Sequence, residues 1–146
     1  MRSILLIGFA AAAAFAAITP AHARDTSVRL DVSEVLDPSY SKDSLDGSVR
    51  FYFAGQPTPA VLSDFGKART SRKTNAVGKS DAQACRWVML TALAALQAEA
   101  KSRGANAVVD ITSAHTFRSP TQFECHAGGI MAGVSLKGRY AKLADR

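Results

Sequence analysis

Two cysteines, Cys85 and Cys125, are the strongest constraint that this 146-residue sequence places on its fold. They follow an N-terminal segment of the kind that directs proteins out of the cytoplasm. In an oxidising compartment, an even pair of cysteines without metal-type spacing usually forms a disulfide. A bridge between them would close a loop of about 40 residues and contribute roughly 4 kcal/mol through loop entropy. We therefore expect a fold that brings these two distant segments within bonding distance.

The N-terminus has the three parts of a secretory signal. Arg2 gives a positive start, residues 4–18 form an apolar run rich in alanine, and Ala21-His22-Ala23 is a small-x-small cleavage site. The run is about 15 residues long, whereas a helix needs about 20 to cross a bilayer, which argues against an uncleaved membrane anchor. We predict that residues 1–23 are removed after Ala23. The mature chain would start at Arg24 in a bacterial periplasm, with no membrane span left.

The rest of the chain is long enough for one domain with one core. Residues 24–47 form a polar N-terminal segment rich in Ser and Asp, and residues 48–146 are predicted to be the folded domain. Over the whole sequence, 18 basic residues outnumber 12 acidic ones, which gives a formal net charge of +6. This balance suits an acidic partner, such as an anionic envelope surface, and it suits a soluble protein without such a partner equally well.

The clearest element is a helix from Ser80 to about Arg103. Ser80 and Gln83 have the spacing of a capping box, and Gly104 is suited to the left-handed turn that ends a helix. Apolar side chains recur at helical spacing along one stripe, with further apolar residues, Trp87 among them, beside it. The stripe consists of Cys85, Val88, Met89, Ala92, Leu96 and Ala100.

Several segments have the alternation or apolar content of strands. They are Val28–Val32, Ser48–Phe53, Lys67–Val77, Ala107–Ile111 and a long strand over Phe123–Leu136. The last strand changes parity midway, which we assign to a bulge or bend at Gly128-Gly129. A strand, a helix and a strand in succession predict a crossover onto a sheet. The fold class is therefore α/β (α+β): a small β-sheet with one principal helix packed on it.

A basic stretch precedes the helix and is the main candidate for an anion-binding site. In an extended strand, three of its cations share one face and Arg72 lies on the other. Binding to a phosphate-rich polymer and a charged edge strand that deters aggregation are both consistent with this pattern, and the second is the commoner role. Interleaved aromatic residues are missing, so we expect no specific nucleic-acid partner. The candidate residues are Lys67, Arg69, Arg72, Lys73 and Lys79.

The cysteines have two alternative roles, as a redox-active pair or as metal ligands. A redox pair usually has the Cys-x-x-Cys spacing, which is not found here. A zinc or copper site would recruit His115 or His126 beside Cys125. Cys125 and His126 are neighbours on a predicted strand, so their side chains should point to opposite faces. We therefore predict no metal site and keep these three residues as the weaker alternative.

Catalytic motifs do not stand out in the sequence. It contains no Gly-x-Ser-x-Gly elbow, phosphate loop or paired-histidine zinc motif. Ser39-Tyr40-Ser41-Lys42 matches Ser-x-x-Lys, but it lies in a polar, turn-rich segment without the companion motifs. We predict a protein that is not an enzyme and needs no cofactor.

Three segments resemble the group of small exported bacterial proteins with YbjQ-type and RcsF-like domains. They are residues 85–97, the helix end and strand start at 100–109 with Gly-Ala-Asn-Ala-Val-Val, and residues 123–138. The resemblance implies a compact α/β domain in which Cys85 and Cys125 form a helix-to-strand disulfide. The chain lacks the lipid-anchor cysteine and second disulfide of RcsF-like sensors. It also lacks a metal cluster. Proteins of this kind are sometimes labelled excinuclease subunits, and the chain lacks the phosphate loop that such a label would require.

Two functional hypotheses follow. The first is a non-enzymatic periplasmic domain that binds an unidentified envelope protein or an anionic envelope surface, or assembles into a homo-oligomer. The resemblance links this domain to envelope-stress sensing or homeostasis. The second is a periplasmic binder of a metal or small ligand that uses Cys125, His126 or His115.

Overall fold

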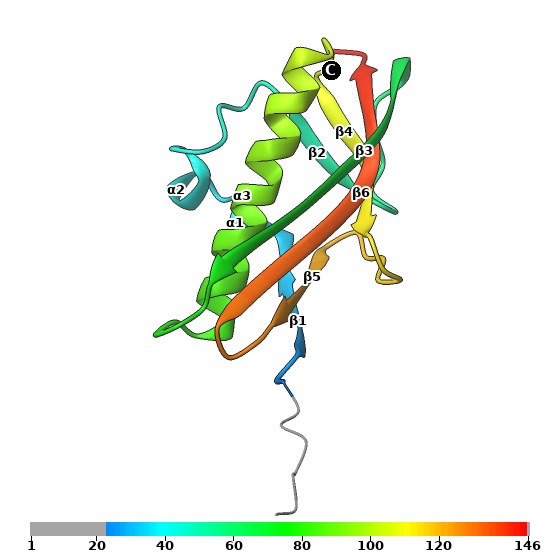
Figure 1. The fold of residues 1–146 in the computed structure, drawn as a ribbon. Helices are drawn as coiled ribbons and strands as arrows, with labels where there is room; N and C mark the ends of the chain where they lie inside the picture. Colours follow the sequence, from blue (N-terminus) through cyan, green and yellow to red (C-terminus); the bar gives the residue numbers. More distant parts are fainter. Residues whose placement is uncertain (1–22, 146) are drawn as a thin grey trace, which may run out of the picture.

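The computed structural model describes residues 23–145, so nearly all of the predicted signal peptide, residues 1–23, lies outside the described part. A curled six-stranded sheet carries the long helix α3 on one face (Figure 1). The elements are β1 (Thr26–Asp31), α1 (Val32–Leu36), α2 (Pro38–Ser41), β2 (Arg50–Phe53), β3 (Val61–Asn75), α3 (Asp81–Ser102), β4 (Ala107–Ser113), β5 (Gln122–Ala127) and β6 (Met131–Leu143). Among the described residues, no helix is both long and apolar enough to cross a membrane.

The predicted helix is confirmed at both ends. The Gln83 backbone N–H donates to Ser80 Oγ at 3.1 Å, and the Ser80 N–H donates to Gln83 Oε1 at 3.0 Å, which completes the capping box. Gly104 has a φ of 74°, the left-handed conformation expected after the last turn. The predicted stripe is buried against the sheet, but Trp87 remains 53% exposed and does not extend the core.

Replacing Ser80 with alanine is expected to lower the free energy of unfolding by about 1 kcal/mol, because the Gln83 N–H loses its acceptor. Urea unfolding monitored by circular dichroism would measure the change. Ser80→Asp is the matched control, since aspartate is an equally good cap and should leave stability within about 0.5 kcal/mol of the wild type. Equal losses in both variants would contradict a capping role.

Strand β6 organises the sheet because it has partners on both edges. One edge pairs antiparallel with β3 from Asn75 opposite Met131 to Val61 opposite Leu143. The other edge pairs first with β5 and then with β4. Beyond these, β1 pairs with β5 and β2 lies parallel to β4. The predicted crossover is confirmed, since β3 and β4 both run antiparallel to β6 and α3 connects them.

The prediction of one long strand over Phe123–Leu136 was wrong. The chain forms a β-hairpin instead, in which β5 and β6 are joined at Gly128–Ile130 and the Gly128 N–H donates to the Met131 carbonyl at 2.8 Å. His126 lies opposite Gly133, and Ala127 opposite Ala132. The change of parity is therefore the reversal of the chain, which restores inward-facing side chains on the second strand.

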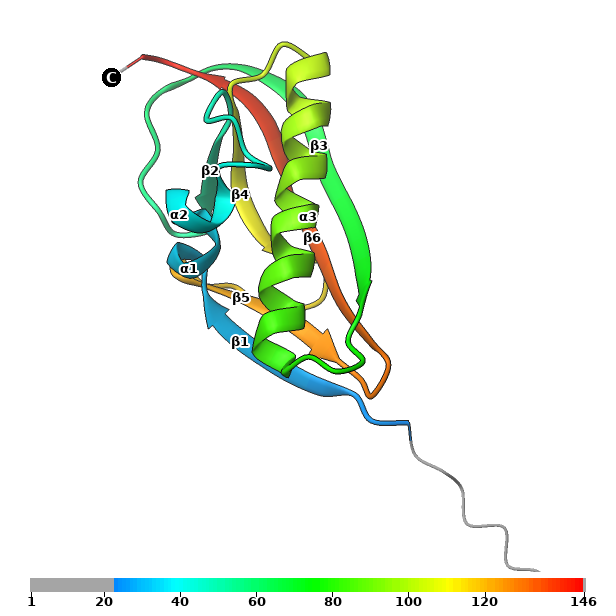
Figure 2. The same cartoon turned by 90° about the vertical axis from the view of Figure 1, so that its left-hand side faces the viewer.

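The N-terminal segment 24–47, predicted to precede the domain, contributes structure to it. Strand β1 pairs with β5 along its whole length and forms one end of the sheet (Figure 2). Helix α1 follows and buries Val32 and Val35 in the main core.

The predicted disulfide is confirmed. Cys85 in the first turns of α3 is bonded to Cys125 in β5, with the two Cα atoms 5.8 Å apart. Both cysteines are fully buried in the core between the helix and the sheet. The bridge therefore ties α3 to the β1–β5 end of the sheet.

Candidate anion-binding site

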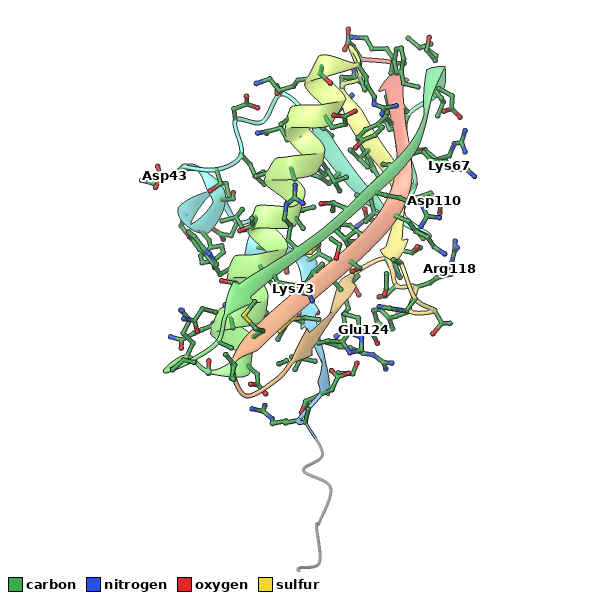
Figure 3. The ribbon with its side chains drawn as sticks, in the orientation of Figure 1. Asp43, Lys67, Lys73, Asp110, Arg118 and Glu124 are labelled. Atoms are coloured by element: carbon green, nitrogen blue, oxygen red, sulfur yellow. A yellow bond between two sulfur atoms is a disulfide. The ribbon has the colours of Figure 1, made fainter. Side chains whose placement is uncertain are left out.

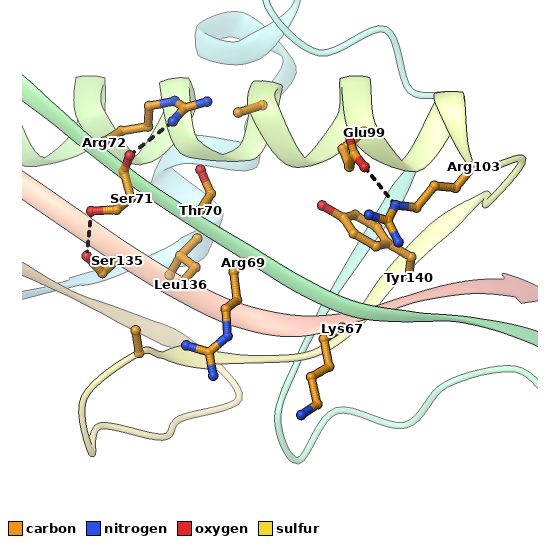
Figure 4. A pocket seen from close by; sticks show the side chains of 12 residues that line it. Lys67, Arg69, Thr70, Ser71, Arg72, Glu99, Arg103, Ser135, Leu136 and Tyr140 are labelled. Carbon is orange, nitrogen blue, oxygen red and sulfur yellow. Dashed lines mark hydrogen bonds and ion pairs between the residues drawn. The ribbon is translucent and has the colours of Figure 1, made fainter.

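The predicted basic stretch lies on β3, a long strand with an unusual position. In the described part of the chain, β3 pairs with β6 alone, so its other edge is open. Ala68 is buried beneath α3, and the residues on either side of it, Lys67 and Arg69, are exposed. Figure 4 shows Arg72 directed toward α3, whereas Arg69 and Lys67 point away from it. The predicted division of these cations between two faces is thus observed.

The structure adds a second row of cations that the sequence analysis missed. On β6, Arg139 lies opposite Lys67 and Lys137 lies opposite Arg69. The predicted strand stopped at Leu136, whereas β6 continues to Leu143. After Leu136, Lys137 and Arg139 alternate with Gly138, which continues the two-residue period of a strand. This alternation could have predicted that the strand extends beyond Leu136. Like charges thus face each other on adjacent strands.

These residues define a surface that we call the basic face, on the side of the sheet away from α3. Arg118, from the loop between β4 and β5, lies against the same hollow as Lys67 and Asp110. Figure 3 shows these three side chains on one side of β3 and β6. The basic face consists of Lys67, Arg69, Lys73, Arg118, Lys137 and Arg139.

Two carboxylates neutralise part of the basic face. Arg139 Nε donates to Asp64 Oδ2 at 2.8 Å, and Arg118 Nη2 donates to Asp110 Oδ1 at 3.3 Å. The backbone N–H of Gly66 and then the Arg139 guanidinium lower the pKa of Asp64 below its ordinary value of 3.8. Asp64 is therefore ionised at neutral pH and holds Arg139 in place. The cations of the face that form no ion pair among the described residues are Lys67, Arg69, Lys73 and Lys137.

A larger groove runs along β3, lined by Glu99 and Arg103 of α3 and also by Lys67 and Arg69 of the basic face (Figure 4). It has a volume of about 750 Å³. The Arg103 guanidinium lies 4.8 Å from the centroid of the Tyr140 ring, and its Nε donates to Glu99 Oε1 at 2.7 Å. Burial raises the pKa of the Tyr140 phenol. Arg103 is already paired with Glu99, so the cations of this groove that form no ion pair among the described residues are Lys67, Arg69 and Arg72.

The last two predicted cations lie at the far end of β3, away from Lys67 and Arg69. Lys79 Nζ donates to the Asn75 carbonyl at 3.0 Å. Lys73 lines a hollow at the tip of the β5–β6 hairpin together with Ile130 and Met131. Ile130 is 69% exposed and Met131 45% exposed. This end of the molecule therefore combines exposed apolar side chains with cations.

The residues of the metal alternative are only partly brought together. Cys125 is bonded to Cys85, so its sulfur is not a thiolate ligand. The rings of His115 and His126 lie 5.4 Å apart between centroids, and His126 Nδ1 is 3.1 Å from Asp25 Oδ1. Among residues 23–145, no group of three or more candidate ligands is close enough to hold a metal ion. The geometry thus favours the basic face as the candidate site.

Comparison with known proteins adds no further constraint on the site. The chain matches no protein-family model, and no curated protein or solved structure shows significant similarity to it.

Proposed function

We propose that this chain is an exported, non-enzymatic binding domain that attaches to an anionic lipid surface of the bacterial envelope through its basic face. The pairing of like charges across β3 and β6 carries the proposal. Arg69 faces Lys137 on adjacent strands and neither has an ion pair among the described residues, an arrangement that destabilises a sheet. Lys67 likewise faces Arg139, whose charge Asp64 offsets in part. An anionic surface would offset that repulsion, and it would release counterions as the cations meet it.

The hairpin tip supports a lipid surface over a protein partner. Ile130 and Met131 are exposed beside Lys73, and the Ala76 N–H donates to the Ile130 carbonyl at 2.7 Å, which brings Val77 alongside. Val77 is itself 60% exposed. Apolar side chains bordered by cations are typical of segments that rest in the headgroup region of a membrane.

The charged β3 edge disfavours self-assembly. An open edge strand is a template for pairing with a second copy, and exposed cations on that strand deter such pairing. Lys67, Arg69 and Lys73 occupy alternate exposed positions along it. The basic stretch therefore serves two roles in this proposal, protection of the edge and attraction to an anionic surface.

The serine of the Ser-x-x-Lys match supports the non-enzymatic part of the proposal. Ser39 Oγ and the Ser39 N–H both donate to Asp37 Oδ1, at the start of α2. The same contacts lower the pKa of Asp37. The Ser39 hydroxyl is thus bound to the carboxylate that caps α2. An envelope-stress or homeostatic role for the attached domain rests on the resemblance alone, and we propose it on that basis.

Neutralising two cations of the basic face, by Lys67→Gln with Lys137→Gln, is expected to weaken binding to anionic vesicles about 30-fold, because each cation near such a surface contributes about 1 kcal/mol. Co-sedimentation with phosphatidylglycerol vesicles would measure binding, and phosphatidylcholine vesicles should retain no protein. Binding of the unmodified protein should fall steeply as salt is raised.

The matched control removes the same charge elsewhere, by Lys42→Gln with Lys142→Gln, and should change binding much less. Lys42 follows α2, and Lys142 lies near the end of β6 outside the basic face. Equal losses in the two double variants would show that net charge alone drives binding. Absence of binding to anionic vesicles at low salt, or salt-independent binding, would overturn the proposal, as would a dimer that buries the basic face.

A further inference from the structure

A small hollow in the basic face lies where β3, β6 and β4 run side by side. Arg69 on β3 is opposite Lys137 on β6, which is opposite Thr112 on β4. The hollow has a volume of about 210 Å³. Pockets for drug-sized ligands span about 300–1,000 Å³, so this space suits a small ion or a single chemical group.

Thr112 gives the hollow an unused hydrogen-bonding group. The residue is only 4% exposed, and its Oγ1 has no hydrogen-bond partner among the described residues. Buried hydroxyls are nearly always paired, so an unpaired one calls for an acceptor or donor that occupies the site. Thr112 faces the same side of the sheet as Lys137, its register partner. Its hydroxyl is therefore placed to donate to a ligand held by the cations.

The charges around the hollow favour an anion with more than one negative charge. Of its cations, Arg118 and Arg139 are paired with Asp110 and Asp64. The other three, Lys67, Arg69 and Lys137, form no ion pair within residues 23–145 and line the hollow. A phosphate monoester, with a charge of about −1.5 to −2 and three terminal oxygens, matches three cations and one hydroxyl.

The backbone at the hollow is also unusual. Asp110 has a φ of 52°, left-handed for a residue other than glycine, and the pairing of β4 with β6 shifts between Val109 and Thr112. Bulges and such conformations are concentrated at binding sites, where they redirect a side chain. Here the shift moves Thr112 onto the face that carries Lys137.

We propose that this hollow binds the phosphate monoester group of a small molecule or lipid headgroup, with Thr112 Oγ1 donating to one oxygen and Lys67, Arg69 and Lys137 surrounding the others. The inference rests on the proposed function and deepens it, because it assigns a specific headgroup chemistry to one point of the basic face.

Calorimetric titration of the oxidised protein with inorganic phosphate, at constant ionic strength, tests the site. Thr112→Val preserves the shape of the side chain and removes the hydroxyl, and it should weaken phosphate binding at least about tenfold. Thr70→Val is the matched control. Thr70 Oγ1 also lacks a partner in the described structure, but Thr70 lies on the α3 side of β3 (Figure 4). It should leave phosphate binding unchanged.

Vesicles separate the two sources of the phosphate group. Phosphatidic acid carries a phosphate monoester and phosphatidylglycerol a diester, so at equal surface charge the protein should prefer phosphatidic acid, and Thr112→Val should abolish that preference.

Binding of inorganic phosphate without vesicle binding would support the hollow for a free phosphate compound and overturn the membrane proposal. Equal binding to both vesicles with no phosphate binding would overturn the hollow and leave the membrane proposal standing. Unchanged phosphate binding by Thr112→Val, or loss in Thr70→Val alone, would also overturn the assignment.

Discussion

Replacing Cys85 and Cys125 together with alanine is expected to lower the free energy of unfolding by about 4 kcal/mol, the loop entropy released when a closed loop of about 40 residues is opened. The bridge spans 40 positions of the sequence and is buried in the core. Guanidinium unfolding of the oxidised protein and the double variant would measure the difference. The loss is comparable to a large part of the stability of an ordinary small domain.

The location of the bridge predicts which part of the molecule loosens first. Strands β1 and β5 pair with each other, and β5 pairs with β6 through only two residue pairs, His126 with Gly133 and Ala127 with Ala132. The disulfide adds the covalent link between β5 and α3. Amide hydrogen exchange should therefore rise most in β1 and β5 of the double variant, and less in β3 and β6, which pair over most of their length.

Reduction provides the control for this experiment. A reducing agent should destabilise the wild type by a similar amount and leave the double variant unchanged. If reduction does not shift the unfolding midpoint of the wild type, the disulfide does not stabilise the fold as argued. If hydrogen exchange rises uniformly instead, the prediction that the β1–β5 end depends most on the bridge is wrong.

Replacing Gly138 with alanine is expected to cost about 3 kcal/mol, the upper part of the range for overpacking a well-packed interior. A Cβ atom at this position would lie 2.7 Å from the Val109 carbonyl oxygen and 3.4 Å from Ile111 Cγ1. The first contact is with backbone, which cannot rotate away. Strands β4 and β6 would have to separate next to the shifted pairing at Asp110. Chemical denaturation would measure the loss.

Gly133 on the same strand offers the matched control. A Cβ at Gly133 would lie 3.5 Å from the Arg72 carbonyl oxygen, an ordinary contact, so Gly133→Ala should change stability by no more than about 0.5 kcal/mol. Similar costs in both variants would mean that general loss of strand flexibility, and not the close approach at Val109, explains the effect. A neutral Gly138→Ala would show that β4 and β6 separate freely at this point.

The helix illustrates what local chemistry can predict. Ser80, Gln83 and Gly104 set the two ends of α3 through hydrogen bonds and backbone conformation within a few residues. Such signals act between neighbours in the chain, so they are visible without tertiary structure. Trp87 shows the limit, because its apolar character placed it beside the stripe that faces the core, whereas in the fold the residue stays 53% exposed.

The second half of the sheet shows where prediction from a pattern failed. A change of parity at Gly128-Gly129 is compatible with a bulge and with a reversal, because both alter which face later residues occupy. Only pairing partners distinguish them: β6 folds back on β5, and most of its length then pairs with β3 and β4. The wrong choice also ended the strand at Leu136 and left Lys137 and Arg139 out of the predicted site.

The amino-acid sequence by itself determined the capped helix, the crossover architecture, the disulfide and the division of the β3 cations between two faces. These follow from local hydrogen bonding, from residue periodicity and from a single available pair of cysteines. Only the tertiary structure decided that β6 places Lys137 and Arg139 opposite Arg69 and Lys67, and that Thr112 is buried among them. The reason is physical: register across strands depends on the packing of the whole core, to which every strand contributes.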